Sequence, residues 1–495
     1  MRKASQWRNG LLVGLSVIAM AAPALAQSPS RPAKKPAIKP AAITTPVTMG
    51  VPHTLDQALA TVYMNQPALQ AERAKLRATD EDVPQAAAGW KPTVIVAGSA
   101  GYGDGLTRQY LGSTGGWEKI QTDRNIATAQ ATLTQPLYTG GKTEANVNRA
   151  KDLVMSERAN LLAQEESSFA NAINAYVGVI QARQLLTLNI NNEQVLREQL
   201  RATNDQYRVG EVTRTDVAQA EAALAGAVAQ RETSEGNLQT ANGTYVQVIG
   251  YQPPADLVPP QPLRLPIANE RQAGEIAAVN NPAVVAARFN DSAAQNAVQA
   301  AFATLLPQVS FQAQIFQSQN SSLRNDNANG YQALLNLSVP LYQGGQEYSS
   351  VRQARQTEQQ QADLVGDAQR TSVQNAVNAW DTLIAARASA ASTETAIRAN
   401  EIALVGVERE HLVGTRTTLD VLNAQQALLQ SRVTLVQNLA SLVTASYGVA
   451  SAIGRLTARD LNLQVPFYDD TAYYNQVKNK WFGVGVPSPD TLFRR

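Results

Sequence analysis

The sequence predicts a mainly α-helical protein with a membrane β part, in which long antiparallel coiled-coil helices carry two β-hairpins of two strands each. Three observations predict this fold class. The chain repeats one plan twice, each copy contains a long stretch of helix-forming residues without proline (141–210 and 345–414), and each copy contains two segments in which polar and apolar residues alternate.

The internal repeat determines the predicted domain organisation. Asn171–Arg183 recurs as Asn375–Arg387, and the same shift relates Gly210 to Gly414. We therefore predict six segments: a signal peptide (1–26), a disordered extension rich in Pro and Lys (27–52), a first repeat (53–254, with a β-hairpin at 93–138), a Pro-rich linker (255–270), a second repeat (271–454, with a β-hairpin at 308–342) and an irregular C-terminal tail that packs on the outside of the helices (455–495).

The first residues predict export from the cytoplasm. Arg2 and Lys3 precede an apolar run, Leu11–Ala22, and Ala24 and Ala26 are the small residues typical of a cleavage site. The alternative is a membrane anchor, but the run is too short to span a bilayer comfortably. No later stretch is expected to approach the roughly 18 apolar residues of a transmembrane helix, so the chain is expected to enter a membrane only through β-strands.

Composition narrows the range of functions. Aromatic residues make up 6% and charged residues 17% of the chain, which suits long helices packed through small side chains. The absence of cysteine excludes disulfides, thiolate metal sites and a thiol nucleophile. Without the signal peptide the chain is near neutral, so nucleic acid is not an expected partner.

The predicted strands have one polar and one apolar face. Val309–Ile315 and Tyr331–Val339 alternate in the second copy, and Ala127–Leu133 alternates in the first. The polar faces carry Gln, Ser and Thr, and polar loops (103–124 and 318–330) are predicted to join the strands. This pattern indicates the wall of a membrane barrel rather than the alternative, a soluble hairpin packed on a helix. A closed membrane barrel needs about eight strands or more, so four strands per chain imply an oligomer.

Each proline-free stretch predicts a helical rod of roughly 100 Å at 1.5 Å per residue. A shorter helix returns behind each rod and ends near Gly250 or Gly454. In the second copy apolar residues recur every seven positions, for example at Val421, Leu428 and Val449. Such heptads indicate coiled-coil packing.

The turns between the paired helices are the most informative motifs. Gly210 and Gly414 suit the left-handed conformation that ends a helix. In both turns a threonine precedes an aspartate at the spacing of a capping box: Thr213 with Asp216, and Thr417 with Asp420. The aspartates are therefore either helix caps or, in an oligomer, members of a ring of negative charge at the narrow end of a pore. Arg214 and Arg416 lie in the same turns and can pair with neighbouring hairpins.

No motif predicts catalysis. Residues 140–143 (GGKT) resemble the end of a phosphate-binding loop, but Pro136 stands where that motif requires glycine. The two histidines, His53 and His411, have no second ligand at metal spacing. We therefore expect neither an enzyme nor a bound cofactor or metal.

Four groups of residues together resemble the TolC family of outer-membrane channel proteins: the opening TLDQALATVYMNQPAL, the segment VPQAAAGWKP before the first strand, two PLYxGG turns and two VGxxTxxDV turns. The resemblance covers residues 54–454. It implies a homotrimer whose twelve strands form one shared barrel in the outer membrane of a Gram-negative bacterium, continued by a twelve-helix α-barrel through the periplasm. The implied partners are a periplasmic adaptor (membrane fusion) protein, an inner-membrane pump of the ABC, RND or MFS type, and outer-membrane lipid.

The family's gate residues carry over by position. Thr215, Asp216 and Arg416 match links between hairpins that keep the channel closed, and a tyrosine of those links falls at His411, which raises the question of a pH-sensitive gate. Of two aspartates that face the lumen, one matches Asp420 and the other falls on Asn423, so a weaker anionic ring is expected. Two further stretches match the adaptor-docking surface: Val209, Gly210 and Glu211, and Val413, Gly414 and Thr415.

The predicted function is an export duct, gated at the helix-hairpin turns, that passes substrates from a pump and adaptor to the exterior. The alternative is a periplasmic coiled-coil adaptor or scaffold without its own pore. Adaptors have one helical hairpin and a lipid or membrane anchor, whereas this chain has two hairpins and alternating strands. The sequence does not identify the cargo.

Overall fold

The computed structural model describes residues 50–111, 113, 115–321, 325–486 and 492–494. The predicted signal peptide and most of the predicted extension (27–52) lie outside these residues. The described chain separates into two compact units, a strand unit (87–143 and 302–345) and a helical unit (50–86, 144–301 and 346–486 with 492–494). Each unit contains parts of both sequence copies, so the compact units do not coincide with the repeats.

The strand unit is a single antiparallel sheet with the strand order β1-β2-β3-β4. Its strands are β1 (Thr93–Leu111), β2 (Gly116–Tyr138), β3 (Gln308–Gln319) and β4 (Asn327–Ser338), and the short 3-10 turns η2 (Ala88–Trp90) and η3 (Ala303–Leu305) precede the two hairpins. The hairpin predicted at 93–138 is confirmed. The second hairpin ends at Ser338, slightly before the predicted residue 342.

The loop predicted at residues 103–124 is wrong. β1 and β2 remain paired without a break from Ala100 opposite Ala127 to Leu111 opposite Gly116. This part of the hairpin carries charged and polar residues on both faces, so an apolar alternation could not reveal it. In the second hairpin the strands also extend into the predicted loop (318–330), and only residues 320–326 connect them.

The register of the sheet confirms the two predicted faces. Val309 lies opposite Leu337 and Ile315 opposite Tyr331 on the apolar face. On the polar face Gln332 Nε2 donates to Gln314 Oε1 at 2.7 Å, and Gln314 Nε2 donates to Gln130 Oε1 at 2.8 Å. This chain of amides joins β2, β3 and β4. The outer edges of β1 and β4 have no strand partner within the described sheet.

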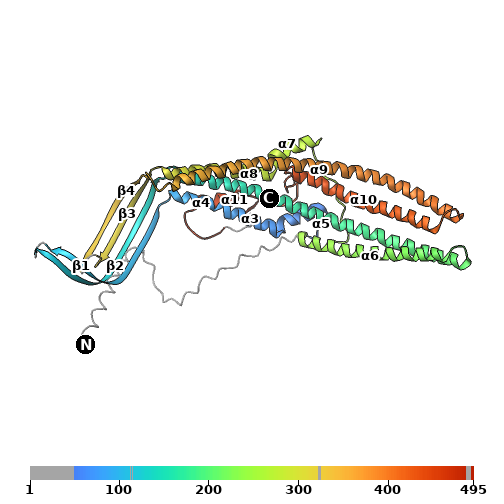
Figure 1. Ribbon diagram of the computed structural model, residues 1–495, viewed down its shortest axis with the longest axis horizontal. Coiled ribbons are helices and arrows are strands. Elements are labelled where there is room, and N and C mark those ends of the chain that lie inside the picture. Colours follow the sequence, from blue (N-terminus) through green and yellow to red (C-terminus); the bar gives the residue numbers. More distant parts are fainter. Residues whose placement is uncertain (1–49, 112, 114, 322–324, 487–491, 495) are drawn as a thin grey trace, which may run out of the picture. The chain divides into compact units, whose positions relative to one another are not determined.

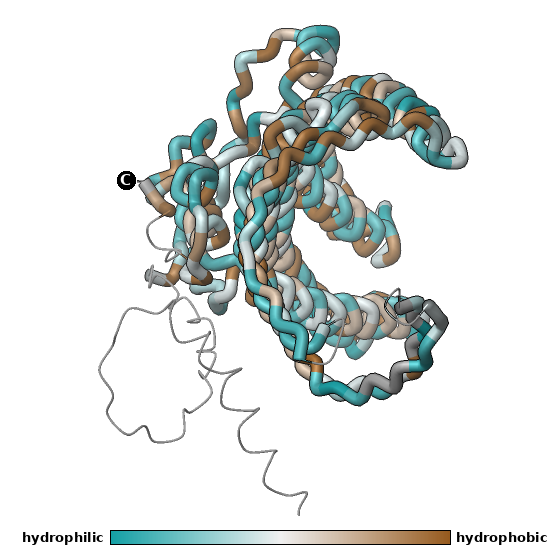
Figure 2. The backbone as a smooth tube through the Cα atoms, turned by 90° about the vertical axis from the view of Figure 1, so that its left-hand side faces the viewer, coloured by the Kyte–Doolittle hydropathy of each residue, from teal (hydrophilic) through white to brown (hydrophobic). Residues whose placement is uncertain are grey.

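The helical unit contains two long antiparallel helix pairs. The first pair is α5 (Lys142–Val209) with α6 (Arg214–Ile249), and the second is α9 (Gln346–Leu412) with α10 (Thr418–Ala452). These bounds confirm the predicted rods and return helices. Figure 1 shows both turns at the same end of the helical unit. Hydrophobic and hydrophilic residues are interspersed along the helices (Figure 2), as expected for helices that pack through one stripe.

Shorter helices pack beside the parts of the rods that lie away from the turns. They are α2 (Leu55–Asn65), α3 (Pro67–Asp80) and α4 (Asp82–Ala87) in the first copy, and α7 (Glu270–Asn280) and α8 (Pro282–Phe302) in the second. Pro67 and Pro282 begin their helices, where the missing N–H is not needed. α7 lies along α9, and Asp152 of α5 accepts hydrogen bonds of 2.8 Å from Ser292 and Asn296 of α8.

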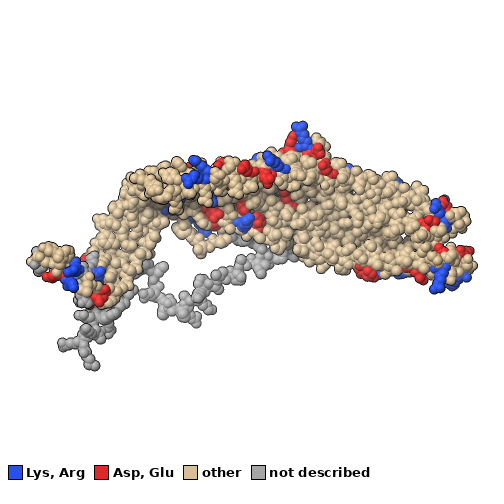
Figure 3. Space-filling model, in the orientation of Figure 1, with Lys and Arg blue, Asp and Glu red and all other residues tan. Residues whose placement is uncertain are grey.

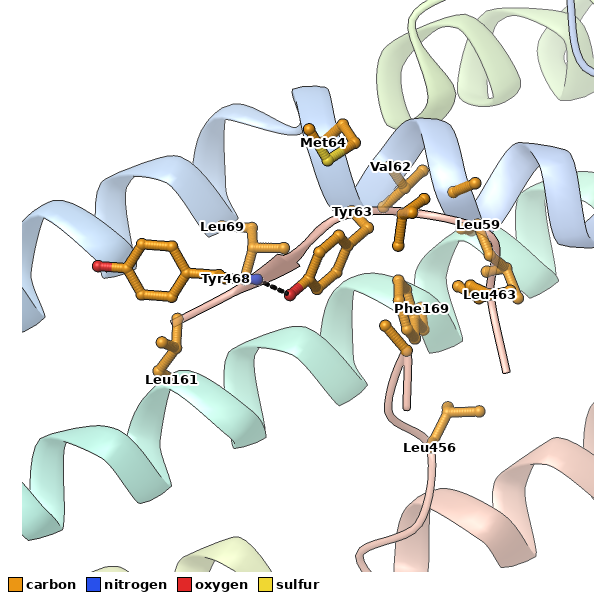
Figure 4. Packing of buried hydrophobic residues seen from close by; sticks show 14 of the residues in the cluster. Leu59, Val62, Tyr63, Met64, Leu69, Leu161, Phe169, Leu456, Leu463 and Tyr468 are labelled. Carbon is orange, nitrogen blue, oxygen red and sulfur yellow. Dashed lines mark hydrogen bonds between the residues drawn. The ribbon is translucent and has the colours of Figure 1, made fainter. Parts of the chain in front are cut away.

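The C-terminal tail differs from its prediction. It is not wholly irregular, because it contains α11 (Ala472–Val477) and a small sheet of β5 (Phe467–Tyr468) with β6 (Phe493–Arg494). It also does not simply cover the outside of the rods. Tyr468 and Tyr473 belong to the main hydrophobic core with α2, α3 and α5, and the Tyr468 amide donates to Tyr63 Oη at 3.0 Å (Figure 4).

One expectation about membrane spans was also wrong. Within the described residues, α10 is long and apolar enough to meet the usual criterion, with a mean hydropathy of 1.2 over 18 residues. The apolar heptad residues that predict a coiled coil contribute to this hydropathy, and Val421, Leu428 and Val449 among them are buried in the helical unit. α10 also packs extensively against α9.

Candidate functional site

The candidate site consists of the two turns that end the long helix pairs, and both turns have the same backbone structure. Gly210 has φ 82° and Gly414 has φ 81°, in the left-handed region where a side chain would be strained. In the first turn the Glu211 amide donates to the Gln206 carbonyl at 2.9 Å, and the second turn repeats this bond at 3.0 Å. These bonds satisfy carbonyls at the end of each helix, as in a Schellman motif.

A capping box starts each return helix, which confirms the capping interpretation. Asp216 N donates to Thr213 Oγ1 at 3.3 Å, and Thr213 N donates to Asp216 Oδ2 at 2.9 Å. Thr417 and Asp420 repeat this arrangement with distances of 3.2 and 3.0 Å. The hydrogen bonds from the threonines lower the pKa of both aspartates, so both carboxyl groups are ionised at neutral pH.

Arg416 is held within its own turn. Its Nε lies 2.8 Å from Glu410 Oε2, and its carbonyl oxygen lies 3.0 Å from His411 Nδ1. The hydrogen bonds from Thr213 are the largest cause of the lowered pKa of Asp216, and the charge of His411 is a smaller cause. Pairing between copies of the chain remains a prediction.

The remaining predicted residues are accessible at the same turns. Thr215 and Asn423 are exposed, and Val209 and Val413 are 73% and 75% exposed. Figure 3 shows charged side chains gathered at both turns, whereas the helix surface behind them carries few.

Two residues that sequence reasoning missed complete the second turn. Leu412 is 80% exposed beside Val413, and Glu410 is the acid that pairs with Arg416. The apolar pair immediately before Gly414 could have revealed Leu412. Nothing in the spacing of Glu410 and Arg416 indicates their pairing, because they approach each other only through the turn.

Behind the turns the two helix pairs meet along a seam that is rich in amides. A cavity of about 430 Å³ lies between α5, α6 and α10, and its lining includes Asn189, Asn192, Gln230, Gln425 and Gln430. The apolar contact in this region is small, since it consists mainly of Leu196, Ala227 and Leu422. Among the described residues no group of His, Cys, Asp and Glu is arranged to hold a metal ion.

Comparison with known proteins assigns the family. The sequence profile of the outer membrane efflux proteins matches residues 56–250 and 274–455, one stretch in each repeat. The chain belongs to the outer membrane efflux protein family. This membership places the protein in the outer membrane of a Gram-negative bacterium, with a large helical portion in the periplasm, and confirms the resemblance to TolC-family channels.

Individual relatives agree with this assignment. The outer membrane efflux protein BepC of Brucella suis is 35% identical over 88% of this chain and 92% of its own. Outer membrane protein TolC of Escherichia coli is 24% identical over 72% of this chain and 75% of its own. The outer membrane channel CmeC of Campylobacter jejuni has the same fold, with a TM-score of 0.71 at 15% identity, over 86% of this chain and 89% of its own. The family and this solved structure are those of channels rather than enzymes.

Proposed function

We propose that three copies of this outer membrane efflux protein assemble into one export duct, which is gated at the helix-hairpin turns. The observation that carries the proposal is the open four-stranded sheet. In a bilayer every backbone N–H and C=O needs a partner within the protein, whereas the outer edges of β1 and β4 lack one in the described sheet. Pairing of β4 with β1 of the next copy would close a ring, and three copies would supply twelve strands.

The exposed side chains of the sheet support its placement in lipid. Val96 is 77% and Leu335 is 68% exposed on the apolar face. Tyr331 and Tyr342, at 87% and 78% exposed, lie towards opposite ends of the second hairpin. An apolar band between aromatic residues is typical of a membrane barrel, and the polar face with its chain of glutamines would line the pore.

The unequal burial of the long helices α5 and α9 supports contact between α9 and a neighbouring copy of the protein. In α5 Val154 and Phe169 are buried in the main hydrophobic core with residues of α2, α3 and the tail. α9 is its repeat equivalent, yet Leu364, Ile384 and Ile402 of α9 are exposed. The first long helix is therefore more fully covered within the chain than the second, a difference that is explained if the next copy of the protein covers the exposed part of α9.

The turns have the properties that a gate and a docking surface need. Val209 on the first turn, and Leu412 and Val413 on the second, are exposed apolar residues to which a periplasmic adaptor can bind. An inner-membrane pump of the ABC, RND or MFS type would drive transport. The seam between the helix pairs, lined by amides with only a small apolar contact, favours movement of one pair against the other. Links from Thr215, Asp216 and Arg416 to neighbouring hairpins would then keep the duct closed.

Conductance of the purified protein in planar bilayers tests this proposal. The double substitution Asp216→Ala with Arg416→Ala should raise the open probability at least several-fold, because it removes charges from both turns. Thr213→Ala is the matched control, since it weakens the same helix cap but retains both charges. Unchanged conductance in the double variant, or an equal rise in the control, would overturn the gate assignment. Absence of any pore together with recovery from the soluble periplasm would favour the scaffold alternative.

A further inference from the structure

The first hairpin extends far beyond the rest of the sheet. Pairing of β2 with β3 ends at Ala127, but β1 and β2 continue together for a further stretch that we name the outer ribbon, residues 102–111 and 116–125. At about 3.3 Å per residue the ribbon is roughly 30 Å long. Figure 1 shows it projecting past the ends of β3 and β4, and Figure 3 shows charged side chains of both signs gathered in this region.

One face of the outer ribbon continues the apolar face of the sheet. Side chains alternate along a strand, so the face that carries Val96 and Ala100 continues through Tyr102 and Arg108 to Tyr110. On β2 the same face carries the residues opposite them. The cross-strand pairs on this face of the ribbon include Tyr102 with Asn125, Asp104 with Asp123, Arg108 with Lys119, and Tyr110 with Trp117.

The pair of Arg108 and Lys119 places two positive charges directly opposite each other. Like charges in this position destabilise a sheet, so a bound anion would stabilise the ribbon. The carboxylate of Glu118 cannot lie between them, because adjacent residues of a strand point to opposite faces. The acidic pair on the same face lies four residues away, roughly 13 Å along the strand, which exceeds the screening length of about 8 Å at physiological salt.

An aromatic pair follows immediately on the same face. The rings of Tyr110 and Trp117 meet edge to face, with centroids 5.7 Å apart. Both side chains are largely exposed. Tyr and Trp favour the interface between lipid and water, where an apolar ring and a polar group are both satisfied. Basic and aromatic residues in adjacent rows suit a ligand that has both phosphate and sugar groups.

We propose that this face of the outer ribbon binds the phosphorylated glycolipid of the outer leaflet, lipopolysaccharide, with a phosphate held by Arg108 and Lys119 and a sugar against Tyr110 and Trp117. The proposal rests on the proposed function, in which the apolar face of the sheet contacts lipid and the ribbon emerges on the outer side. Arg108 lies six residues beyond Tyr102, roughly 20 Å along the strand. With a strand tilt of about 40°, Arg108 lies roughly 15 Å higher than Tyr102 along the membrane normal. This height places Arg108 within the sugar and phosphate layer above the hydrocarbon.

Binding of lipopolysaccharide to the full-length protein in detergent tests the proposal. The test variant is Arg108→Ala with Lys119→Ala, and the matched control is Arg124→Ala, which removes a positive charge from the opposite face of the same hairpin. We expect the double variant to bind at least tenfold more weakly and the control to remain within twofold of the unchanged protein. Chemically dephosphorylated lipopolysaccharide should show the weak binding with all three proteins.

Three results would overturn the proposal. They are undiminished binding by the double variant, an equal loss in the Arg124→Ala control, or equal affinity for vesicles of phosphatidylglycerol, which would indicate attraction to any anionic surface. Thermal unfolding of each variant establishes that it is folded. Bilayer conductance separates the two proposals: a protein that forms no pore contradicts the proposed function, whereas a normal pore that binds lipopolysaccharide without Arg108 and Lys119 contradicts only this inference.

Discussion

Replacing Arg73 with alanine should release the C-terminal tail from the helical unit. The Arg73 side chain is 1% exposed. Its guanidinium carbon lies 4.5 Å from the ring centre of Tyr63, 5.2 Å from that of Tyr468 and 5.3 Å from that of Phe493. The first ring belongs to α2 and the other two to the tail. The buried guanidinium of Arg73 therefore contacts both α2 and the C-terminal tail.

The cost of the substitution follows from burial. A desolvated cation–π contact is worth up to about 2 kcal/mol, and removing one partner of a buried charge pair costs about 3–5 kcal/mol. The nearby acid is Glu165, which accepts a hydrogen bond of 2.6 Å from the Ala458 amide. Burial raises the pKa of Glu165, so it can take up a proton when Arg73 is lost, and we expect the lower end, about 3 kcal/mol.

Circular dichroism and limited proteolysis measure this effect. At roughly 2–4 °C per kcal/mol, the Tm should fall by about 6–12 °C, and the tail should become sensitive to protease at temperatures where the long helices are still folded. The matched control is Arg271→Ala, which removes an exposed ion pair of 3.0 Å with Glu275 and should cost less than about 1 kcal/mol. A Tm equal to that of the control, with the tail still protected, would refute the assignment of Arg73 as the contact that holds the tail.

Burial raises the pKa of Asp80 to about 7 and that of Glu166 to about 8, above the unfolded values of about 4. The free energy of unfolding should therefore fall as pH rises from about 4 to 8. In thermal unfolding, the Asp80→Asn variant should show a weaker dependence of stability on pH and should be more stable than the unchanged protein at pH 8. Arg183 donates to the carbonyls of Pro253, Pro254 and Ala255 at 3.2, 2.7 and 3.0 Å. The Arg183→Ala variant should therefore be destabilised by about 1–3 kcal/mol, and its linker should become sensitive to protease. The control is Arg387→Ala, at the equivalent, exposed position of the second repeat, which should change stability by less than about 0.5 kcal/mol. Gln314→Glu, which places a charge in the amide chain of the polar face, should increase the cation selectivity measured by reversal potential in planar bilayers, and an unchanged reversal potential would contradict the pore-lining role of that face.

The rods and turns could be predicted because their signals are local. An uninterrupted helical stretch, a glycine at the helix end and a threonine three residues before an aspartate each specify their structure within one or two turns of helix. Because the sequence repeats, each of these patterns occurs in both copies, and each copy supports the prediction made from the other. The apolar alternation at Val309–Ile315 predicted a strand for the same reason, since one face of that strand is uniformly apolar.

The missed features depend on contacts between residues that are distant in sequence. The outer ribbon carries charged and polar residues on both faces, so no apolar alternation reveals its strands. They follow from the backbone pairing of β1 with β2, which continues to Leu111 opposite Gly116. The tail has no period, and its place in the core is set by Arg73 and Tyr63, which lie hundreds of residues earlier in the chain. The pairing of Glu410 with Arg416 exists only because the turn between them reverses the backbone.

The two interpretations of Asp216 and Asp420 turn out to be compatible. Each cap uses one carboxylate oxygen, Oδ2, which accepts from both the N–H and the hydroxyl group of the threonine, at 2.9 and 2.6 Å for Asp216 and 3.0 and 2.9 Å for Asp420. No described hydrogen bond uses the second oxygen of either group. Because the caps also lower the pKa of both carboxyl groups, they keep each aspartate charged and fix its position on the first turn of its helix. A ring of such residues in a trimer would therefore hold six fixed negative charges without any cost to helix capping, and the lost charge at Asn423 would weaken that ring without weakening a cap.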